Sequence, residues 1–114
     1  MYPSLINIYF RILRGEKFMY CTGMMAANST TWNKMFDIYI KGKLKENPKR
    51  LLKGLSCAEN PNIIINYLNI LAFNTSFFDN DDHLHVFTHI LKRHSRNDKI
   101  LKYILNNFEA IKPK

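Results

Sequence analysis

The chain has 114 residues, of which 46% are hydrophobic, and it contains four glycines and four prolines. This composition predicts one folded domain over residues 1–114 and argues against wholesale disorder and a turn-rich all-β fold. The net charge of +8 favours anionic partners, although its lysines and arginines are mixed with apolar residues, as on a solvated helix face.

Apolar residues recur at three- and four-residue intervals along most of the chain, which predicts an all-α protein. We expect helices over residues 3–13, 17–27, 31–41, 48–57, 61–73, 80–94 and 98–111. Their expected buried stripes include Trp32, Phe36 and Tyr39; Leu84, Phe87 and Leu91, with Val86 and Ile90 beside them; and Leu101, Ile104, Leu105 and Phe108. Short loops predict antiparallel helical hairpins, which favour part of a solenoid-like α-superhelix, although periodicity alone also fits a closed bundle.

Helix starts are marked by capping residues. Asn47-Pro48 and Asn60-Pro61 each place an amide cap before a proline in the first turn, and Asp79 to Asp82 place negative charge at a helix start. Thr30 or Thr31 is expected to cap the helix that contains Trp32. Asp79 to Asp82 also resemble the beginning of a calcium loop, but the required glycine and closing glutamate are missing, which favours capping.

No apolar run is long enough to predict a membrane span. The apolar N-terminal stretch is interrupted by Asn7 and Arg11 and precedes no small-residue cleavage site, so no signal peptide is expected in this chain.

His85 and His89 have the i, i+4 spacing of two zinc ligands on one helix face. A zinc protease requires glutamate directly after the first histidine, and Val86 occupies that position. His83 and His94 lie on the same predicted helix, and surface or capping roles are expected for all four histidines. We therefore expect no metal ligand, no cofactor and no catalytic residue in this chain.

Two sequons place Asn28 and Asn74 in predicted loops, which makes them candidates for N-glycosylation if the protein is secreted. Cys21 and Cys57 are the chain's two cysteines. They would be buried thiols in a reducing compartment, whereas an even count in a secreted protein favours a bridge.

Several short motifs occur in a characteristic order: Tyr20-Cys21-Thr22-Gly23, then Trp32 and Tyr39, then Leu51-Leu52 and Leu55-Ser56-Cys57, then Tyr67-Leu68. Over residues 12 to 111 the chain resembles the C-terminal helical, endoplasmic-reticulum-aminopeptidase-like domain of aminopeptidase N-type zinc aminopeptidases, particularly insect-like members. The closing Asn106-Asn107-Phe108 also matches this pattern.

The resemblance implies a superhelical array of helical hairpins that caps the catalytic chamber, assists peptide binding and is non-catalytic by itself. It implies a Cys21–Cys57 disulfide, an extracellular or secretory location, and the catalytic domain and peptide substrate as partners. Zinc would belong to that separate domain.

The chain departs from the family pattern in three places. Asp79-Asn80-Asp81 replaces most of an Arg-x-Gln-Asp segment, Arg96-Asn97 stands where a glycine is frequent, and Phe108 replaces a closing tryptophan. Full-length members of the family continue with more helical hairpins beyond the position of Lys114, so the resemblance implies that the chain is an incomplete piece of a larger domain. The alternative prediction is a small basic helical module that binds nucleic acid or an anionic membrane surface.

Overall fold

The computed structural model describes residues 20–42 and 48–113, and all regular secondary structure in these ranges is helical. The all-α prediction is confirmed. The helices are α2 (Tyr20–Met24), α3 (Ser29–Ile40), α4 (Lys49–Leu55), α5 (Pro61–Phe73), the 3-10 helix η1 (Thr75–Phe77), α6 (Asn80–His94), α7 (Asp98–Asn106) and α8 (Phe108–Ile111). The helix expected over 3–13 and the cap expected at Asn47 lie outside the described residues.

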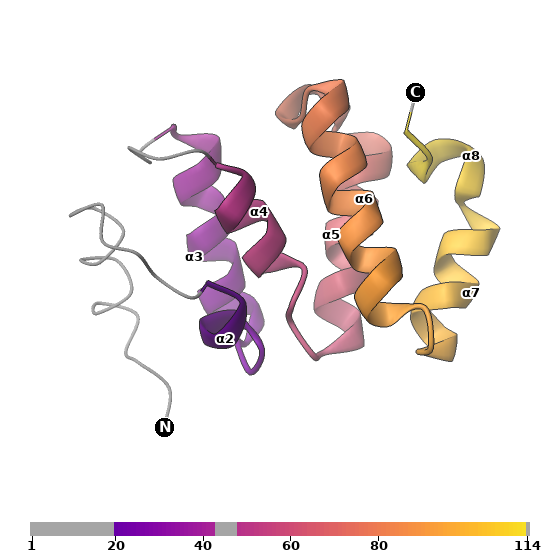
Figure 1. The fold of residues 1–114 in the computed structure, drawn as a ribbon, viewed down its shortest axis with the longest axis horizontal. Helices are drawn as coiled ribbons and strands as arrows, with labels where there is room; N and C mark the ends of the chain where they lie inside the picture. The colour runs from indigo at the N-terminus through magenta and orange to yellow at the C-terminus, as the bar shows by residue number, and fades with distance from the viewer. Residues whose placement is uncertain (1–19, 43–47, 114) are drawn as a thin grey trace.

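The helices follow one another across the molecule in chain order. Figure 1 shows α2, α3 and α4 on one side, α5 and α6 in the middle, and α7 and α8 on the other side. Helix α4 packs against α2, α3 and α6, while α5 packs against α6, α7 and α8. The short helix α4 therefore links the N-terminal group to the middle of the protein.

Asparagine and aspartate side chains begin four of the helices. Asn60, Asp79 and Asn97 accept hydrogen bonds from backbone N–H groups at the starts of α5, α6 and α7. The cap predicted for α3 is wrong, because the Asn28 Oδ1 accepts from the Thr31 N–H at 2.8 Å and the helix begins at Ser29. Asparagine is a stronger N-cap than threonine, so the helix starts earlier than the threonines indicate.

The helix predicted over 98–111 is interrupted at Asn107. Its backbone has φ −124° and ψ 23°, and its side-chain Nδ2 donates to the Tyr103 carbonyl at 2.9 Å. Asparagine competes for backbone groups in this way, which ends α7 and lets α8 begin separately.

The core is one continuous apolar cluster, but leucines from two of the predicted stripes are exposed. Leu84 is 50% exposed, and the buried face of α6 consists of His83, Val86, Phe87, Ile90 and His94. In α7, Leu105 is 66% exposed while Ile100 and Ile104 are buried. Apolar residues occupy two adjacent faces of these helices, so periodicity alone did not show that Leu84 and Leu105 lie outside the core.

Candidate functional site at the disulfide-linked end of α4

The C-terminal end of α4 is fastened to α2 by a disulfide. Cys21 in α2 and Cys57, two residues beyond α4, are bonded, with a Cα–Cα distance of 5.2 Å and a sequence separation of 36. The structure thus contains the bridge that the family resemblance implies. Closing a loop of this length stabilises a protein by about 4 kcal/mol in the chain-entropy model.

Helices α2 and α4 approach each other closely at Gly54. A Cβ atom at this position would overlap the Cβ of Tyr20 and lie 3.0 Å from the Tyr20 carbonyl carbon. Tyr20 and Gly54 are both buried. Glycine at position 54 therefore allows the close contact that brings Cys21 beside Cys57.

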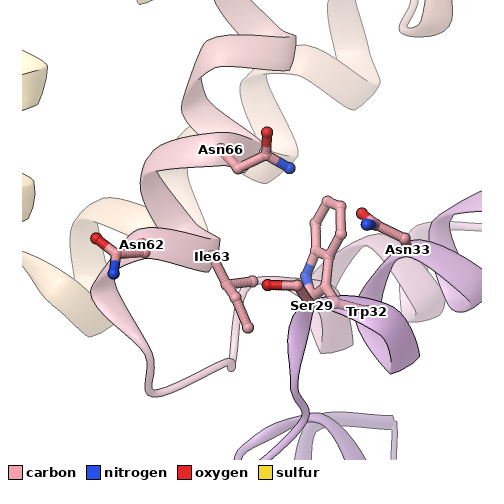
Figure 2. A pocket seen from close by; sticks show the side chains of 6 residues that line it. All are labelled: Ser29, Trp32, Asn33, Asn62, Ile63 and Asn66. Atoms are coloured by element: carbon pink, nitrogen blue, oxygen red, sulfur yellow. The ribbon is translucent and has the colours of Figure 1, made fainter.

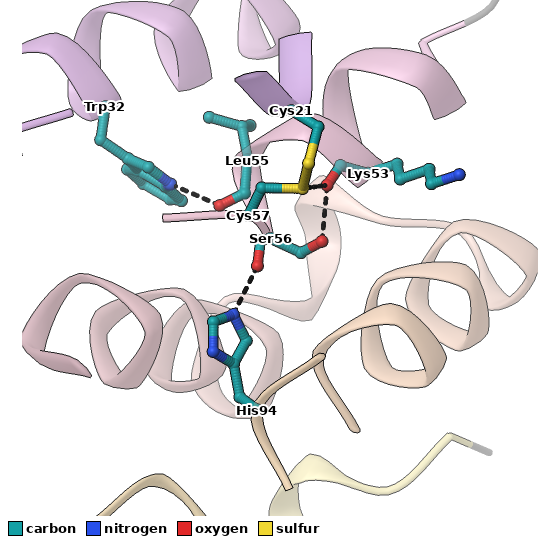
Figure 3. The surroundings of a disulfide bond; sticks show 7 residues. All are labelled: Cys21, Trp32, Lys53, Leu55, Ser56, Cys57 and His94. Carbon is teal, nitrogen blue, oxygen red and sulfur yellow. Dashed lines mark hydrogen bonds between the residues drawn. A yellow bond between two sulfur atoms is a disulfide. The ribbon is translucent and has the colours of Figure 1, made fainter. Parts of the chain in front are cut away.

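Side chains from three other helices hydrogen-bond to carbonyl groups of α4 and its C-cap. The Trp32 Nε1 donates to the Leu55 carbonyl at 2.9 Å, the Tyr67 hydroxyl donates to the Leu52 carbonyl at 3.1 Å, and the His94 Nε2 lies 2.6 Å from the Ser56 carbonyl. The Ser56 hydroxyl donates to the Lys53 carbonyl at 2.5 Å. Figure 3 shows Trp32 and His94 reaching this turn from opposite sides, next to the disulfide.

These contacts satisfy the carbonyl groups that a helix end leaves without intrahelical partners. Since a carbonyl oxygen can only accept, the His94 Nε2 must carry a hydrogen. We refer to these four carbonyl contacts together with the disulfide as the α4 hub.

The opposite end of α4 is tied to the start of α6. The Lys49 Nζ lies 2.5 Å from Asp81 and 2.8 Å from Asp82, and the His85 Nε2 lies 3.1 Å from the Lys49 carbonyl. The hydrogen-bonded carboxylates raise the pKa of Lys49, and Lys49 lowers the pKa of Asp81. Helices α4 and α6 are therefore held in parallel at both ends.

Two of the four histidines are buried, so the surface position expected for them is wrong, although both hydrogen-bond to a carbonyl group at a helix end. His83 and His94 are 8% and 9% exposed. His83 Nε2 lies 2.6 Å from the Ile111 carbonyl, so it joins α6 to α8 in the same manner as His94 joins α6 to the hub. A buried imidazole is tolerated where its ring N–H finds a carbonyl, and sequence periodicity does not reveal that partner.

His85 and His89 do lie together, with ring centroids 4.5 Å apart. Among the described residues, however, no group of three His, Cys, Asp or Glu side chains is arranged to hold a metal ion. Burial lowers the pKa of His89, and the nearby charges of His85, Lys53 and Lys92 lower it further. Weak or absent zinc binding stays a prediction.

The aromatic residues expected in the core are packed beside the hub. Trp32 stacks on Phe36 at 5.3 Å and meets Tyr67 edge-on at 4.9 Å. Tyr39 is partly buried, and its hydroxyl donates to the Phe77 carbonyl at 2.7 Å. Burial, together with the charges of Asp82 and Asp79, raises the pKa of Tyr39 to about 12. This cluster connects α3 to α5 and η1.

An amide-rich pocket lies between α3 and α5. It has a volume of about 310 Å³ and is lined by Ser29, Trp32, Asn33, Asn62, Ile63 and Asn66. Figure 2 shows the indole between side chains of the two helices. The asparagine amides offer donors and acceptors but no group suited to nucleophilic or acid–base catalysis.

A second pocket of about 240 Å³, which we call the basic pocket, borders the disulfide. Its lining consists of Cys21, Lys53, Ser56, Cys57, His89, Lys92 and Arg93. Lys53 belongs to α4, whereas Lys92 and Arg93 belong to α6, so the sequence alone does not show that these cations lie around one pocket.

Both sequons lie on exposed residues. Asn28 caps α3 through Oδ1, and the backbone N–H of Asn74 donates to the Ile70 carbonyl at 2.8 Å at the end of α5. Glycosylation of either residue stays a prediction.

Comparisons of the chain with protein-family models, with curated proteins and with solved structures find no match. In the part of the chain that the structure describes, no helix combines the length and hydrophobicity needed to cross a membrane.

Proposed function

We propose that the chain is a non-catalytic helical segment resembling the C-terminal domain of an aminopeptidase N-type zinc aminopeptidase. In full-length members of that family, this domain caps the catalytic chamber and assists peptide binding in proteolysis. The partners of this chain would then be the catalytic domain and, through the chamber wall, the peptide substrate. Zinc would be held by the catalytic domain and not by these helices.

One observation carries the proposal: the separate motifs of the resemblance meet in a single structural unit. Tyr20 packs on Gly54, Cys21 is bonded to Cys57, and Trp32 and Tyr67 donate to carbonyl groups of α4. The motifs that are separate along the chain therefore meet around one helix, α4. This convergence supports reading them together as the signature of a domain.

An extracellular or secretory location is part of this proposal. Disulfides form and persist chiefly in oxidising compartments, and the Cys21–Cys57 bridge fits such a compartment. Exposed apolar side chains on α7 and α8, such as Leu105 and Phe108, fit contact with another part of a larger assembly.

The test is association with a catalytic domain. Purified oxidised chain would be mixed with an aminopeptidase N-type catalytic domain that lacks its own C-terminal helices, and complex formation would be followed by analytical ultracentrifugation. We expect a stoichiometric complex, and no product from an amino-acid arylamide when the chain is assayed alone, with or without zinc. Turnover by the chain alone that disappears in His85→Ala would overturn the non-catalytic assignment, and failure to associate would overturn the chamber-wall assignment.

The second candidate is a basic module that binds nucleic acid or an anionic membrane surface. It is favoured by the exposed cations Lys92, Arg93, Arg96, Lys99 and Lys102 on or between α6 and α7. Tight binding to a polyanion that weakens steeply with salt would support this candidate over the first.

A further inference from the structure

We propose that the basic pocket between α4 and α6 binds a tetrahedral oxyanion, a phosphate or sulfate group. The pocket combines three cationic side chains, one imidazole and the wall formed by the disulfide. This inference does not depend on whether the chain belongs to an aminopeptidase.

Among the described residues, no carboxylate forms an ion pair with the cations of the pocket. The ion pairs within the described residues involve Lys41, Lys49 and Lys112. Within these same ranges, no ion pair includes Lys53, Lys92 or Arg93, and all three are exposed. An incoming anion would therefore not have to displace an existing carboxylate partner.

The charges around His89 indicate that the electrostatic potential in the pocket is positive. Apart from burial, the influences on its pKa come from His85, Lys53 and Lys92, and each of them disfavours the protonated ring. An oxyanion bound beside His89 would counter the positive charges of these neighbours.

The helix ends oppose anion binding, but they do not outweigh the side chains. The pocket lies at the C-terminal turns of α4 and α6, each equivalent to at most about half a negative charge. Together they amount to about one negative charge against three positive side chains. The hydrogen bond from the Ser56 hydroxyl to the Lys53 carbonyl also occupies one of the acceptors at the end of α4. The net charge around the pocket therefore remains positive.

The pocket's size and fixed walls select a small ligand. Its volume of about 240 Å³ is below the range typical of drug-sized ligands. The disulfide holds α2 against the end of α4, and His94 holds α6 against Ser56. The backbone segments that carry Lys53, Lys92 and Arg93 are therefore held in fixed relative positions. Arg93 offers the planar donor pair that suits phosphate and sulfate, and the lysines add point charges.

The experiment is a titration of the oxidised full chain by ¹H–¹⁵N NMR at constant ionic strength. Inorganic phosphate and inorganic sulfate are added in separate arms, and a phosphorylated and a sulfated monosaccharide form two further arms. We expect saturable shifts confined to the residues around the pocket, and a rise in the pKa of His89 on binding because the anion stabilises its charged form. Tighter binding of a sugar ester than of the free ion would assign the group to a conjugate, and equal binding would assign it to the free ion.

Matched variants separate a built site from general charge attraction. Lys53→Gln and Arg93→Gln each remove one positive charge from the pocket and should weaken binding by about tenfold or more. Lys102→Gln removes the same charge from an exposed position on α7 and should change affinity by less than about twofold. These exposed positions should tolerate the substitutions, which circular dichroism would verify.

The proposal fails if the shifts are scattered over the surface, or if Lys102→Gln weakens binding as much as Arg93→Gln. It also fails if the pKa of His89 in the unmodified chain is the same with and without saturating phosphate and sulfate. That last measurement requires no variant to fold.

Discussion

At the residue scale, side-chain donors placed opposite particular backbone carbonyls fix how the helices meet. His94 illustrates this, because its imidazole is buried and joins α6 to the Ser56 carbonyl at the end of α4. Burial lowers the pKa of His94 below 6.5, and the hydrogen bond that His94 donates to the Ser56 carbonyl opposes this effect only in part.

The lowered pKa values of His89 and His94 predict that the folded protein is less stable in acid. In the folded state His89 and His94 bind protons less readily than in the unfolded chain, where the pKa is near 6.5. Their contribution to stability is therefore present above pH 6.5 and is lost as the pH falls through the folded-state pKa values. Urea unfolding should give a smaller free energy of unfolding at pH 5 than at pH 7.5, and the difference should shrink in His94→Gln. Equal free energies at the two pH values in the unmodified protein would contradict this prediction.

Gly54→Ala should destabilise the protein by about 1–3 kcal/mol, since the added methyl group forces α2 and α4 apart. Alanine is otherwise the better helix former, so a loss of stability would isolate the steric effect. Lys53→Ala, on the exposed side of the same helix, is the matched control and should change stability by less than about 0.5 kcal/mol. Both values can be read from chemical denaturation, and a Gly54→Ala protein as stable as the control would refute the close contact.

Sequence predicted residue-level features well where the signal was local. The caps at Asn60 and Asp79 follow from side chain and backbone within three residues of each other. Leu84 and His83 were assigned to the wrong faces because the deciding contact is distant: His83 meets the carbonyl of Ile111, 28 residues away. A hydrogen bond to a remote carbonyl leaves no periodic trace in the sequence.

At the element scale, helix identity was easier to predict than helix ends. The structure bears out α5 and α6 over the expected residues, while the expected 98–111 helix divides at Asn107 and η1 went unpredicted. At both places a side chain hydrogen-bonds to a backbone carbonyl. The Asn107 amide donates to the Tyr103 carbonyl in α7, and the Tyr39 hydroxyl donates to the Phe77 carbonyl in η1.

Helix α3 provides the test for the aromatic cluster. Trp32 is 1% exposed and both packs on Phe36 and donates to Leu55. Trp32→Ala should lower the free energy of unfolding by about 3–5 kcal/mol. Phe73→Ala is the aromatic control, because Phe73 is 62% exposed, and it should have a much smaller effect in the same denaturation experiment. A loss under about 1 kcal/mol for Trp32→Ala would place the indole outside the core.

At the scale of the whole molecule, the disulfide is the strongest single constraint that the sequence indicated. Its pairing came from the family resemblance, since two cysteines alone are equally consistent with free thiols. The all-α class came from periodicity, while the α4 hub and the basic pocket required the three-dimensional contacts between α4 and α6.

Loss of this bridge should destabilise the whole fold. The double variant Cys21→Ala and Cys57→Ala, compared with the oxidised protein, should lose about 4 kcal/mol of unfolding free energy. Chemically reduced protein should show a similar loss, because both lack the same cross-link. Thermal unfolding followed by circular dichroism would measure it, and unchanged stability in both forms would mean that the bridge adds nothing to the native packing.

The contacts of the α4 hub cannot all form until the chain has been synthesised as far as His94. The hub's partners lie 23 residues before the Leu55 carbonyl and 15 and 38 residues after the Leu52 and Ser56 carbonyls, so this seven-residue helix cannot be completed by local contacts. At ordinary translation rates, the 38 residues from Ser56 to His94 take about 2–8 s to synthesise. During that interval Cys57 is present on the nascent chain before its turn is fixed. A nascent chain that pauses before His94 should therefore be the stage most vulnerable to mispairing of Cys57 with a foreign thiol.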